Sequence, residues 1–203
     1  MRVAAVLLAA GAAHRFGGPS KLLVEFDGAP LIHRAARAVE GCGAAVTIAV
    51  TGRDAEAVTA ALSGFTLDCV YNPAWADGLG GSVATGVRAL GTGIDAALIV
   101  PGDMSLLTPE FLQEMIRFAA RMPEPRPICF AQLPDGTQSN PVLWPKRYFP
   151  ELMALLGTAG GKVLLTRYAP QTMAFPVTDV RLLMDIDTPD DLVRASALIA
   201  ARA

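Results

Sequence analysis

Short apolar runs alternate with amphipathic stretches along most of the chain. Several of the runs contain no polar residue, which is typical of strands that are covered on both faces of a sheet. The run at residues 96–100 is entirely apolar, so we expect it near the centre. We predict strands at residues 3–8, 45–50, 67–71, 96–100, 128–131 and 142–144, and edge strands at 172–175 and 182–186.

Between these runs, apolar residues recur at the spacing of the buried face of a helix. Thr108-Pro109 and Thr188-Pro189 have the residue types of helix starts, with Thr as N-cap and Pro in the first turn. We predict helices from Pro30 to Gly41, at residues 54–62, 82–90, 108–122, 151–156 and 162–168, and from residue 188 onward.

The alternation of strands and helices predicts a three-layer α/β fold with a mainly parallel, Rossmann-like sheet. The chain has 203 residues, a length that suits a single domain with a full hydrophobic core. We therefore expect one domain over residues 1–203.

Composition narrows the class of protein. Hydrophobic residues make up 52% of the chain and the net charge is −2, so neither a membrane span nor a basic face for nucleic acid is indicated. Three cysteines without a Cys-x-x-Cys pair and two histidines argue against a disulfide framework or a zinc site. The expected setting is cytoplasmic, with no nucleic-acid or membrane partner.

A loop of small residues follows the first strand and contains two basic residues, Arg15 and Lys21. Glycine and alanine let backbone N–H groups approach a ligand closely, and two cations beside them suit a triphosphate. The loop lacks the spacing of a dinucleotide fingerprint, and the Gly-Lys-Ser/Thr of a Walker loop does not occur in the sequence. A simple surface turn is the remaining alternative.

Polar residues also follow the other predicted parallel strands. Ligands of such sheets bind at the carboxyl ends of the strands, where Thr51, Asn72 and Asp103 stand. Asp103 is the one acid between residues 96 and 107, so it is a candidate ligand for Mg²⁺; a turn-shaping role is the alternative.

The glycine-rich segment from Gly78 to Ser82 leads into a predicted helix. A helix start of this kind can hold a phosphate or a base edge. Alternatively it is a flexible turn with Ser82 as N-cap. Trp75 is expected mainly to pack, with ligand stacking as the less favoured role.

The residues Leu8-Ala9-Ala10-Gly11, Arg15, Gly17 and Lys21 resemble the signature loop of the MobA-like nucleotidyltransferases, in particular the molybdenum cofactor cytidylyltransferases and guanylyltransferases. The resemblance implies the nucleotide-diphospho-sugar transferase fold. Gly102-Asp103-Met104 is similar to the family's metal motif, with Ser105 in place of Pro, and Asp187 matches a second metal residue. The implied nucleotide-binding set is Leu8, Ala9, Ala10, Gly11, Arg15, Lys21, Thr51, Asn72, Gly78 and Ser82.

The match is weakest at the acceptor end, where the family's cytidylyltransferases typically have Gly-Asp-x-Gly-Ala-Arg. Here Thr158 replaces the Asp and Lys162 replaces the Arg. Lys162 is still a candidate to bind an acceptor phosphate as a point charge.

The resemblance implies an Mg²⁺-dependent enzyme that joins CMP from CTP to molybdopterin and releases pyrophosphate. Arg15 and Lys21 would be catalytic, Asp103 and Asp187 would bind the metal, and Ala9-Ala10-Gly11 favours CTP over GTP. A labile product would be expected to pass to an apo-molybdoenzyme, although no segment marks that surface. The alternatives are a guanylyltransferase, a methylerythritol- or sugar-phosphate cytidylyltransferase, a non-catalytic cofactor-insertion partner and, more remotely, a dehydrogenase.

Overall fold

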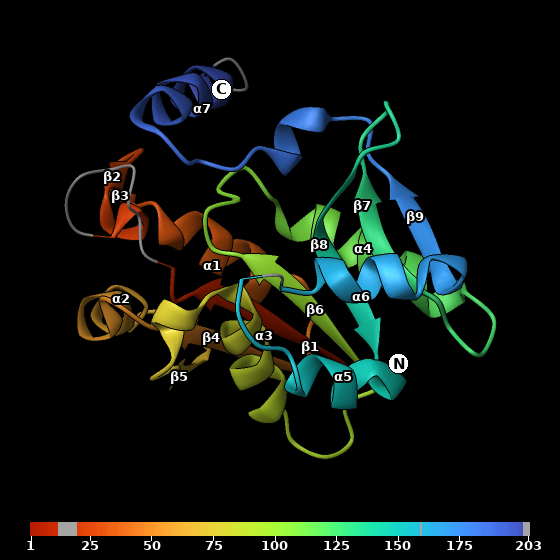
Figure 1. Ribbon diagram of the computed structural model, residues 1–203. Helices are drawn as coiled ribbons and strands as arrows, with labels where there is room; N and C mark the ends of the chain where they lie inside the picture. Colours follow the sequence, from red (N-terminus) through yellow and green to blue (C-terminus); the bar gives the residue numbers. More distant parts are fainter. Residues whose placement is uncertain (12–19, 159, 201–203) are drawn as a thin grey trace.

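A seven-stranded sheet forms the centre of the computed structural model (Figure 1), which describes residues 1–11, 20–158 and 160–200. The strand order is β5-β4-β1-β6-β8-β7-β9, and a separate hairpin is formed by β2 and β3. The strands are β1 Val3–Ala9, β2 Glu25–Phe26, β3 Ala29–Pro30, β4 Val46–Thr51, β5 Asp68–Tyr71, β6 Ala96–Pro101, β7 Ile128–Gln132, β8 Gln138–Pro145 and β9 Thr172–Pro176.

The sheet is mainly parallel. Strands β5, β4, β1 and β6 run in one direction, and β8 is antiparallel to both β6 and β7. Strand β9 pairs in parallel with β7 and forms an edge. The α/β fold class predicted from the sequence is confirmed.

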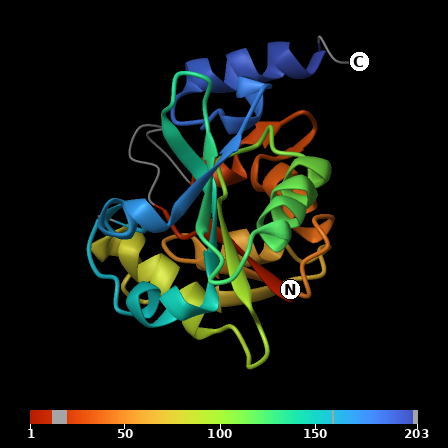
Figure 2. The same ribbon diagram turned by 90° about the vertical axis from the view of Figure 1, so that its right-hand side faces the viewer.

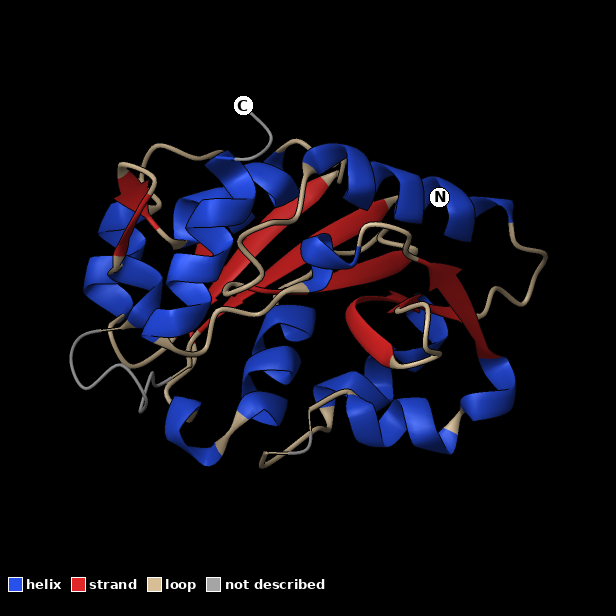
Figure 3. Ribbon diagram, turned by 90° about the horizontal axis from the view of Figure 1, so that it is seen from above, coloured by secondary structure: helices blue, strands red, loops and turns tan. Residues whose placement is uncertain are grey.

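Helices cover both faces of the sheet (Figure 3). The α-helices are α1 Ile32–Glu40, α2 Ala55–Ala61, α3 Leu79–Arg88, α4 Pro109–Arg121, α5 Phe149–Met153, α6 Lys162–Arg167 and α7 Pro189–Ala200. Short 3-10 helices lie at Lys21–Leu23, Trp75–Asp77, Lys146–Tyr148, Ala169–Gln171 and Val180–Leu183. As predicted, Thr108 caps α4, and its side chain accepts a hydrogen bond from the backbone N–H of Phe111.

Strand β1 is buried along its whole length because successive residues enter two different cores. Val3, Ala5 and Leu7 belong to the core that includes residues of α1 and α4. Val6 and Leu8 belong to the core that includes residues of α3, α5 and α6. This packing on both faces holds the carboxyl end of β1 in place.

A third, smaller core joins the C-terminal helix to the hairpin β2–β3. Its buried residues include Phe26, Leu106, Ile186 and Ala195, and Figures 1 and 2 show α7 beside the hairpin. The packing of Ile186 with Leu106 brings the segment before α7 next to the loop that follows β6. Two carboxylates predicted to bind metal are carried by these segments.

One predicted strand is absent from the structure, and several predicted boundaries differ from it. Residues 182–186 do not form an edge strand: they lie at the end of the 3-10 helix Val180–Leu183 and in the extended segment after it. Helix α1 begins at Ile32 because Pro30 belongs to β3, and α3 begins at Leu79 instead of Ser82.

Among the residues described, no helix has the length and apolar character that crossing a bilayer requires.

Candidate functional site

The predicted site residues gather at the carboxyl edge of the parallel strands. Ala10 and Gly11 follow β1, Thr51 ends β4, Asn72 follows β5 and Asp103 follows β6. Because these four strands are parallel neighbours, their carboxyl ends lie on one side of the sheet. This is the edge at which open α/β sheets bind ligands.

A cleft of about 520 Å³ opens at this edge. Six of the residues predicted to bind nucleotide line it, and Asp103 and Trp75 lie on its wall as well. The six are Leu8, Ala10, Gly11, Lys21, Gly78 and Ser82.

Three other predicted nucleotide residues do not line this cleft. The Ala9 side chain belongs to the core on the opposite face of the sheet. Thr51 and Asn72 are each 2% exposed, and the backbone N–H of Asn72 donates to the Thr51 carbonyl over 2.9 Å. Arg15 lies outside the described residues.

Asn72 acts on the cleft through Ser82. Its amide Nδ2 donates to the Ser82 hydroxyl over 3.1 Å, and its Oδ1 accepts from the backbone N–H of Ala74 over 3.0 Å. Ser82 lies within the first turns of α3 and is not the N-cap, which is Gly78. The Asn72 amide therefore holds a buried hydroxyl in the cleft wall.

Gly78 has a φ of +124°, a conformation that L residues rarely adopt. A side chain here would place its Cβ 2.6 Å from the backbone of Gly157, and the N–H of Gly80 donates to the Gly157 carbonyl over 2.8 Å. The start of α3 and the loop near Thr158 are thus in direct backbone contact.

Lys21 lies between the two carboxylates that were predicted to bind metal. Its Nζ is 2.7 Å from Oδ2 of Asp103 and 2.6 Å from Oδ1 of Asp187. Desolvation alone would lower the pKa of Lys21, but the nearby carboxylates, Asp103 above all, more than offset it and leave that pKa raised. The structure therefore brings Lys21, Asp103 and Asp187 together from positions far apart in the sequence.

Backbone contacts fix the two acidic segments relative to each other. The N–H of Ile186 donates to the carbonyl of Asp103 over 3.2 Å. Oδ2 of Asp191 accepts from the N–H groups of Asp187 and Thr188 and from the Thr188 hydroxyl. The side-chain bond from Thr188, a bond from the Arg194 guanidinium and the two backbone bonds together lower the pKa of Asp191 to about 2. Asp191 thus does more than complement the helix dipole, because it shapes the turn that carries Asp187.

One oxygen of Asp103 is suited to a further ligand. Its Oδ1 is buried without a hydrogen-bond partner, an arrangement that is costly for a carboxylate and that a cation would relieve. Within the described chain no cluster of three or more His, Cys, Asp or Glu side chains could hold a metal. Metal binding by Asp103 and Asp187 would therefore need oxygens of substrate or water as additional ligands.

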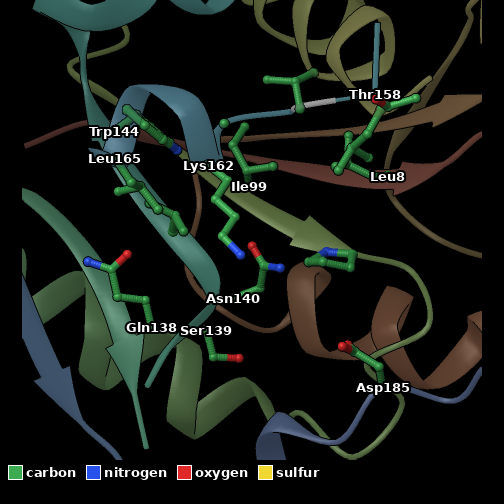
Figure 4. Close-up of a pocket in the computed structure, with 15 residues that line it drawn as sticks. Leu8, Ile99, Gln138, Ser139, Asn140, Trp144, Thr158, Lys162, Leu165 and Asp185 are labelled. Carbon is green, nitrogen blue, oxygen red and sulfur yellow. The ribbon is translucent and has the colours of Figure 1, made fainter. Parts of the chain in front are cut away.

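A second pocket, of about 400 Å³, adjoins the cleft and is drawn in Figure 4. Leu8, Leu79, Pro101 and Thr158 line both cavities and form their shared wall. In the second pocket the Lys162 and Asn140 side chains point toward one another (Figure 4). Apolar side chains, including the buried Trp144, form much of the rest.

Asp185 lines this second pocket and was not singled out from the sequence. Asp185 as a whole is exposed to solvent. Partial desolvation of its carboxyl, with repulsion from Asp103 and Asp187, nevertheless raises the pKa of that carboxyl to about 6. Its position two residues before Asp187 is a signal that could have marked it, because both belong to one acidic segment.

The two adjoining cavities suit an enzyme that brings two substrates together, and the lysine between paired carboxylates lies in one of them. A family model for the MobA-like NTP transferase domain matches residues 5–172. The chain belongs to this family, and it is a nucleotidyltransferase.

Individual relatives agree with this assignment. A molybdenum cofactor guanylyltransferase of Vibrio atlanticus is 28% identical over 95% of both chains. The bifunctional protein GlmU of Agrobacterium fabrum is 35% identical over 51% of this chain, which spans only 23% of that protein.

Solved structures share the fold. A nucleotidyl transferase from Methanothermobacter has a TM-score of 0.84 at 22% identity, with 100% of this chain and 99% of that chain covered. A Mycobacterium tuberculosis protein in complex with manganese has a TM-score of 0.74 at 21% identity, with 97% and 99% covered.

Proposed function

We propose that this enzyme transfers CMP from CTP to the phosphate of molybdopterin and depends on Mg²⁺. The observation that carries the proposal is the placement of Lys21 between Asp103 and Asp187 in a cleft that adjoins a second pocket. The cleft would hold the nucleotide and the second pocket the acceptor. The guanylyltransferase activity named for the Vibrio relative supports GTP as the alternative donor.

The reaction needs no protein nucleophile, because the acceptor phosphate is already anionic. One of its oxygens forms a bond to the α-phosphorus, and the bond from that phosphorus to the pyrophosphate oxygen breaks. Catalysis then consists of positioning and charge stabilisation. Lys21, together with Arg15 from outside the described residues, would balance the charge of the triphosphate.

Asp103 and Asp187 would hold the metal ion. The buried, unpartnered Oδ1 of Asp103 and the hard oxygen donors of both residues fit Mg²⁺. When bound, the metal would neutralise phosphate charge. The Mycobacterium neighbour, which has a similar fold, was solved in complex with manganese, and this supports the proposal of a divalent ion.

The preference for CTP rests on the region around Ala10. A Cβ on Gly52 would lie 2.5 Å from the Ala10 carbonyl and 2.7 Å from the Cβ of Trp75, so these residues are packed closely beside the cleft. Ala10 is 3% exposed and belongs to a buried core, so its methyl group alone does not select the base. The support for CTP is the resemblance of Ala9-Ala10-Gly11 to the cytidylyl branch, because the guanylyl branch more often has glycine in place of Ala10.

The acceptor would enter the second pocket with its phosphate toward Lys162 and its ring against the apolar wall. A lysine binds a phosphate as a point charge, without the paired hydrogen bonds of an arginine. We therefore expect weaker anchoring of the acceptor phosphate than an arginine at this position would give. We also propose that the product passes from this enzyme to an apo-molybdoenzyme.

Thermal unfolding with Mg²⁺ and each of CTP, GTP, ATP and UTP tests the donor, because a ligand of the native state raises Tm. We expect CTP alone to raise Tm, and Lys21→Ala to abolish the rise. A rise with GTP alone would assign the guanylyl reaction instead.

Pyrophosphate release tests the acceptor. We expect release only when CTP, Mg²⁺ and molybdopterin are all present. Release with a methylerythritol phosphate or a sugar phosphate, and not with molybdopterin, would refute the proposed acceptor. CTP binding without release for any acceptor would favour a non-catalytic insertion partner over the proposed reaction.

A further inference from the structure

The Arg34 side chain connects helix α1 to two other parts of the molecule. Its Nε donates to the carbonyl of Ser105 over 3.0 Å, and its Nη1 is 2.9 Å from Oδ2 of Asp27 in the hairpin turn. The guanidinium also lies over the Phe26 ring, 5.6 Å from its centroid. The arginine thus spans the hairpin and the loop that carries Asp103.

Ser105 lies in a tight turn just after Asp103. The N–H of Leu107 donates to the Met104 carbonyl over 3.4 Å, which closes the turn, and Ser105 is fully buried. On its other side the loop is fixed by the bond from Ile186 to the Asp103 carbonyl. Arg34 and the segment before Asp187 therefore restrain the Asp103 loop from two directions.

We infer that Arg34 is a positioning residue for the Asp103 carboxylate. The inference rests on the proposed metal role of Asp103. A guanidinium-to-carbonyl hydrogen bond is charge-assisted and directional, so its loss releases the Ser105 carbonyl and with it the turn. Metal binding depends on placing two carboxylates together, and a small shift of one of them weakens it.

This role differs from a general contribution to folding. The Arg34 side chain is 27% exposed and Asp27 is 58% exposed, and an ion pair between such groups contributes little to stability. Substitution of Arg34 should therefore lower the melting temperature mainly through the lost bond to the Ser105 carbonyl, and metal affinity should fall in addition.

The experiment measures Mn²⁺ affinity by the loss of its free-ion electron paramagnetic resonance signal. Arg34→Met is expected to weaken Mn²⁺ binding about tenfold. This is the lower end of the effect of removing a direct partner of a metal ligand, because Arg34 acts on Asp103 through the Ser105 carbonyl. Arg34→Lys keeps the charge without the fork and should restore only part of the loss. Arg37→Met is the matched control on the exposed face of the same helix, and it should bind as the wild type does.

A second substitution separates loop restraint from other effects. Ser105 is the second residue of the turn from Met104 to Leu107. The fixed φ of proline suits this position in the common turn types. Ser105→Pro in the Arg34→Met protein should therefore stiffen the turn and recover most of the Mn²⁺ affinity.

The outcomes are distinct. If the wild type binds Mn²⁺ and Arg34→Met binds it with the same dissociation constant, the inference is overturned and the proposed function is not affected. A parallel fall in Tm and affinity that Ser105→Pro does not reverse would also overturn it. No Mn²⁺ binding by the wild type, in the presence of nucleotide as well, would refute the metal site and this inference together.

Discussion

Replacing Lys21 by Met should change metal binding and catalysis in opposite directions. The Lys21 ammonium lies 2.7 and 2.6 Å from oxygens of Asp103 and Asp187, where a metal ion would also bind. The ammonium and the metal therefore compete for the two carboxylates. Without the ammonium, a free metal ion should bind more tightly, while the triphosphate loses a cation that it needs.

The size of the gain follows from the geometry. Two unit charges about 4 Å apart interact by roughly 4 kcal/mol at an effective dielectric constant near 20. Side-chain exposure of 16% for Lys21, 22% for Asp103 and 48% for Asp187 reduces this by screening, and a displaced lysine regains hydration. We expect a net gain of about 1.4 kcal/mol, which is about tenfold in the Mn²⁺ dissociation constant.

The assay is a Mn²⁺ titration without nucleotide, followed by electron paramagnetic resonance, beside a turnover measurement. Lys162→Met is the matched control, because it removes the same charge from the adjoining pocket and should leave Mn²⁺ affinity unchanged. Turnover of Lys21→Met should fall by about 10²-fold or more. Weaker or unchanged Mn²⁺ binding in Lys21→Met would refute the competition.

Further substitutions test other parts of the site. Gly78→Ala should lower Tm by roughly 5 °C, because φ is +124° and the new Cβ would lie 2.6 Å from the backbone of Gly157. Gly136→Ala is the control: its φ is +88° but the space around it is open, so it should lower Tm by less. The pKa of Asp185 is raised to about 6, so ionisation of this carboxyl disfavours the native state. The Tm of Asp185→Asn relative to that of the wild type should therefore rise from about pH 4 to about pH 6 and then level off. A difference in Tm that does not depend on pH would contradict this. Lys162→Arg should lower KM for a phosphorylated acceptor several-fold with little change in kcat, which steady-state kinetics would show; an unchanged KM would place the acceptor phosphate elsewhere.

Much of the fold could be predicted because burial on both faces of a strand leaves a continuous apolar run. Residues 3–8 and 96–100 are examples, and both are central strands. The same rule failed at residues 182–186, whose apolar residues Leu183 and Ile186 are buried but against a helix and loops. An apolar run indicates burial, and it does not indicate whether the backbone pairs with a strand.

The direction of β8 was also missed, since periodicity carries no information about direction. The short turn between Leu133 and Thr137, closed by a 3.0 Å bond from the Leu133 N–H to the Thr137 carbonyl, is what makes β8 antiparallel to β7. The sequence Pro134-Asp135-Gly136 is typical of a turn, and it contained that information.

The placement of the candidate site residues was predictable where they follow strands closely, as Asp103 does. The contact between Lys21 and Asp187 joins residues 166 positions apart, and it depends on the packing of α7 against the hairpin. Local pattern cannot supply such a contact, and neither can it reveal Arg34, whose role arises from a carbonyl on another element.

The wall that the two cavities share has a kinetic consequence. Leu8, Leu79, Pro101 and Thr158 face both spaces, so donor and acceptor can be held side by side without either leaving first. The proposed reaction should therefore proceed through a ternary complex, and double-reciprocal plots should intersect instead of running parallel. The dinucleotide product would occupy both cavities at once and should compete with each substrate, so its departure is a natural step at which a receiving protein would accelerate turnover.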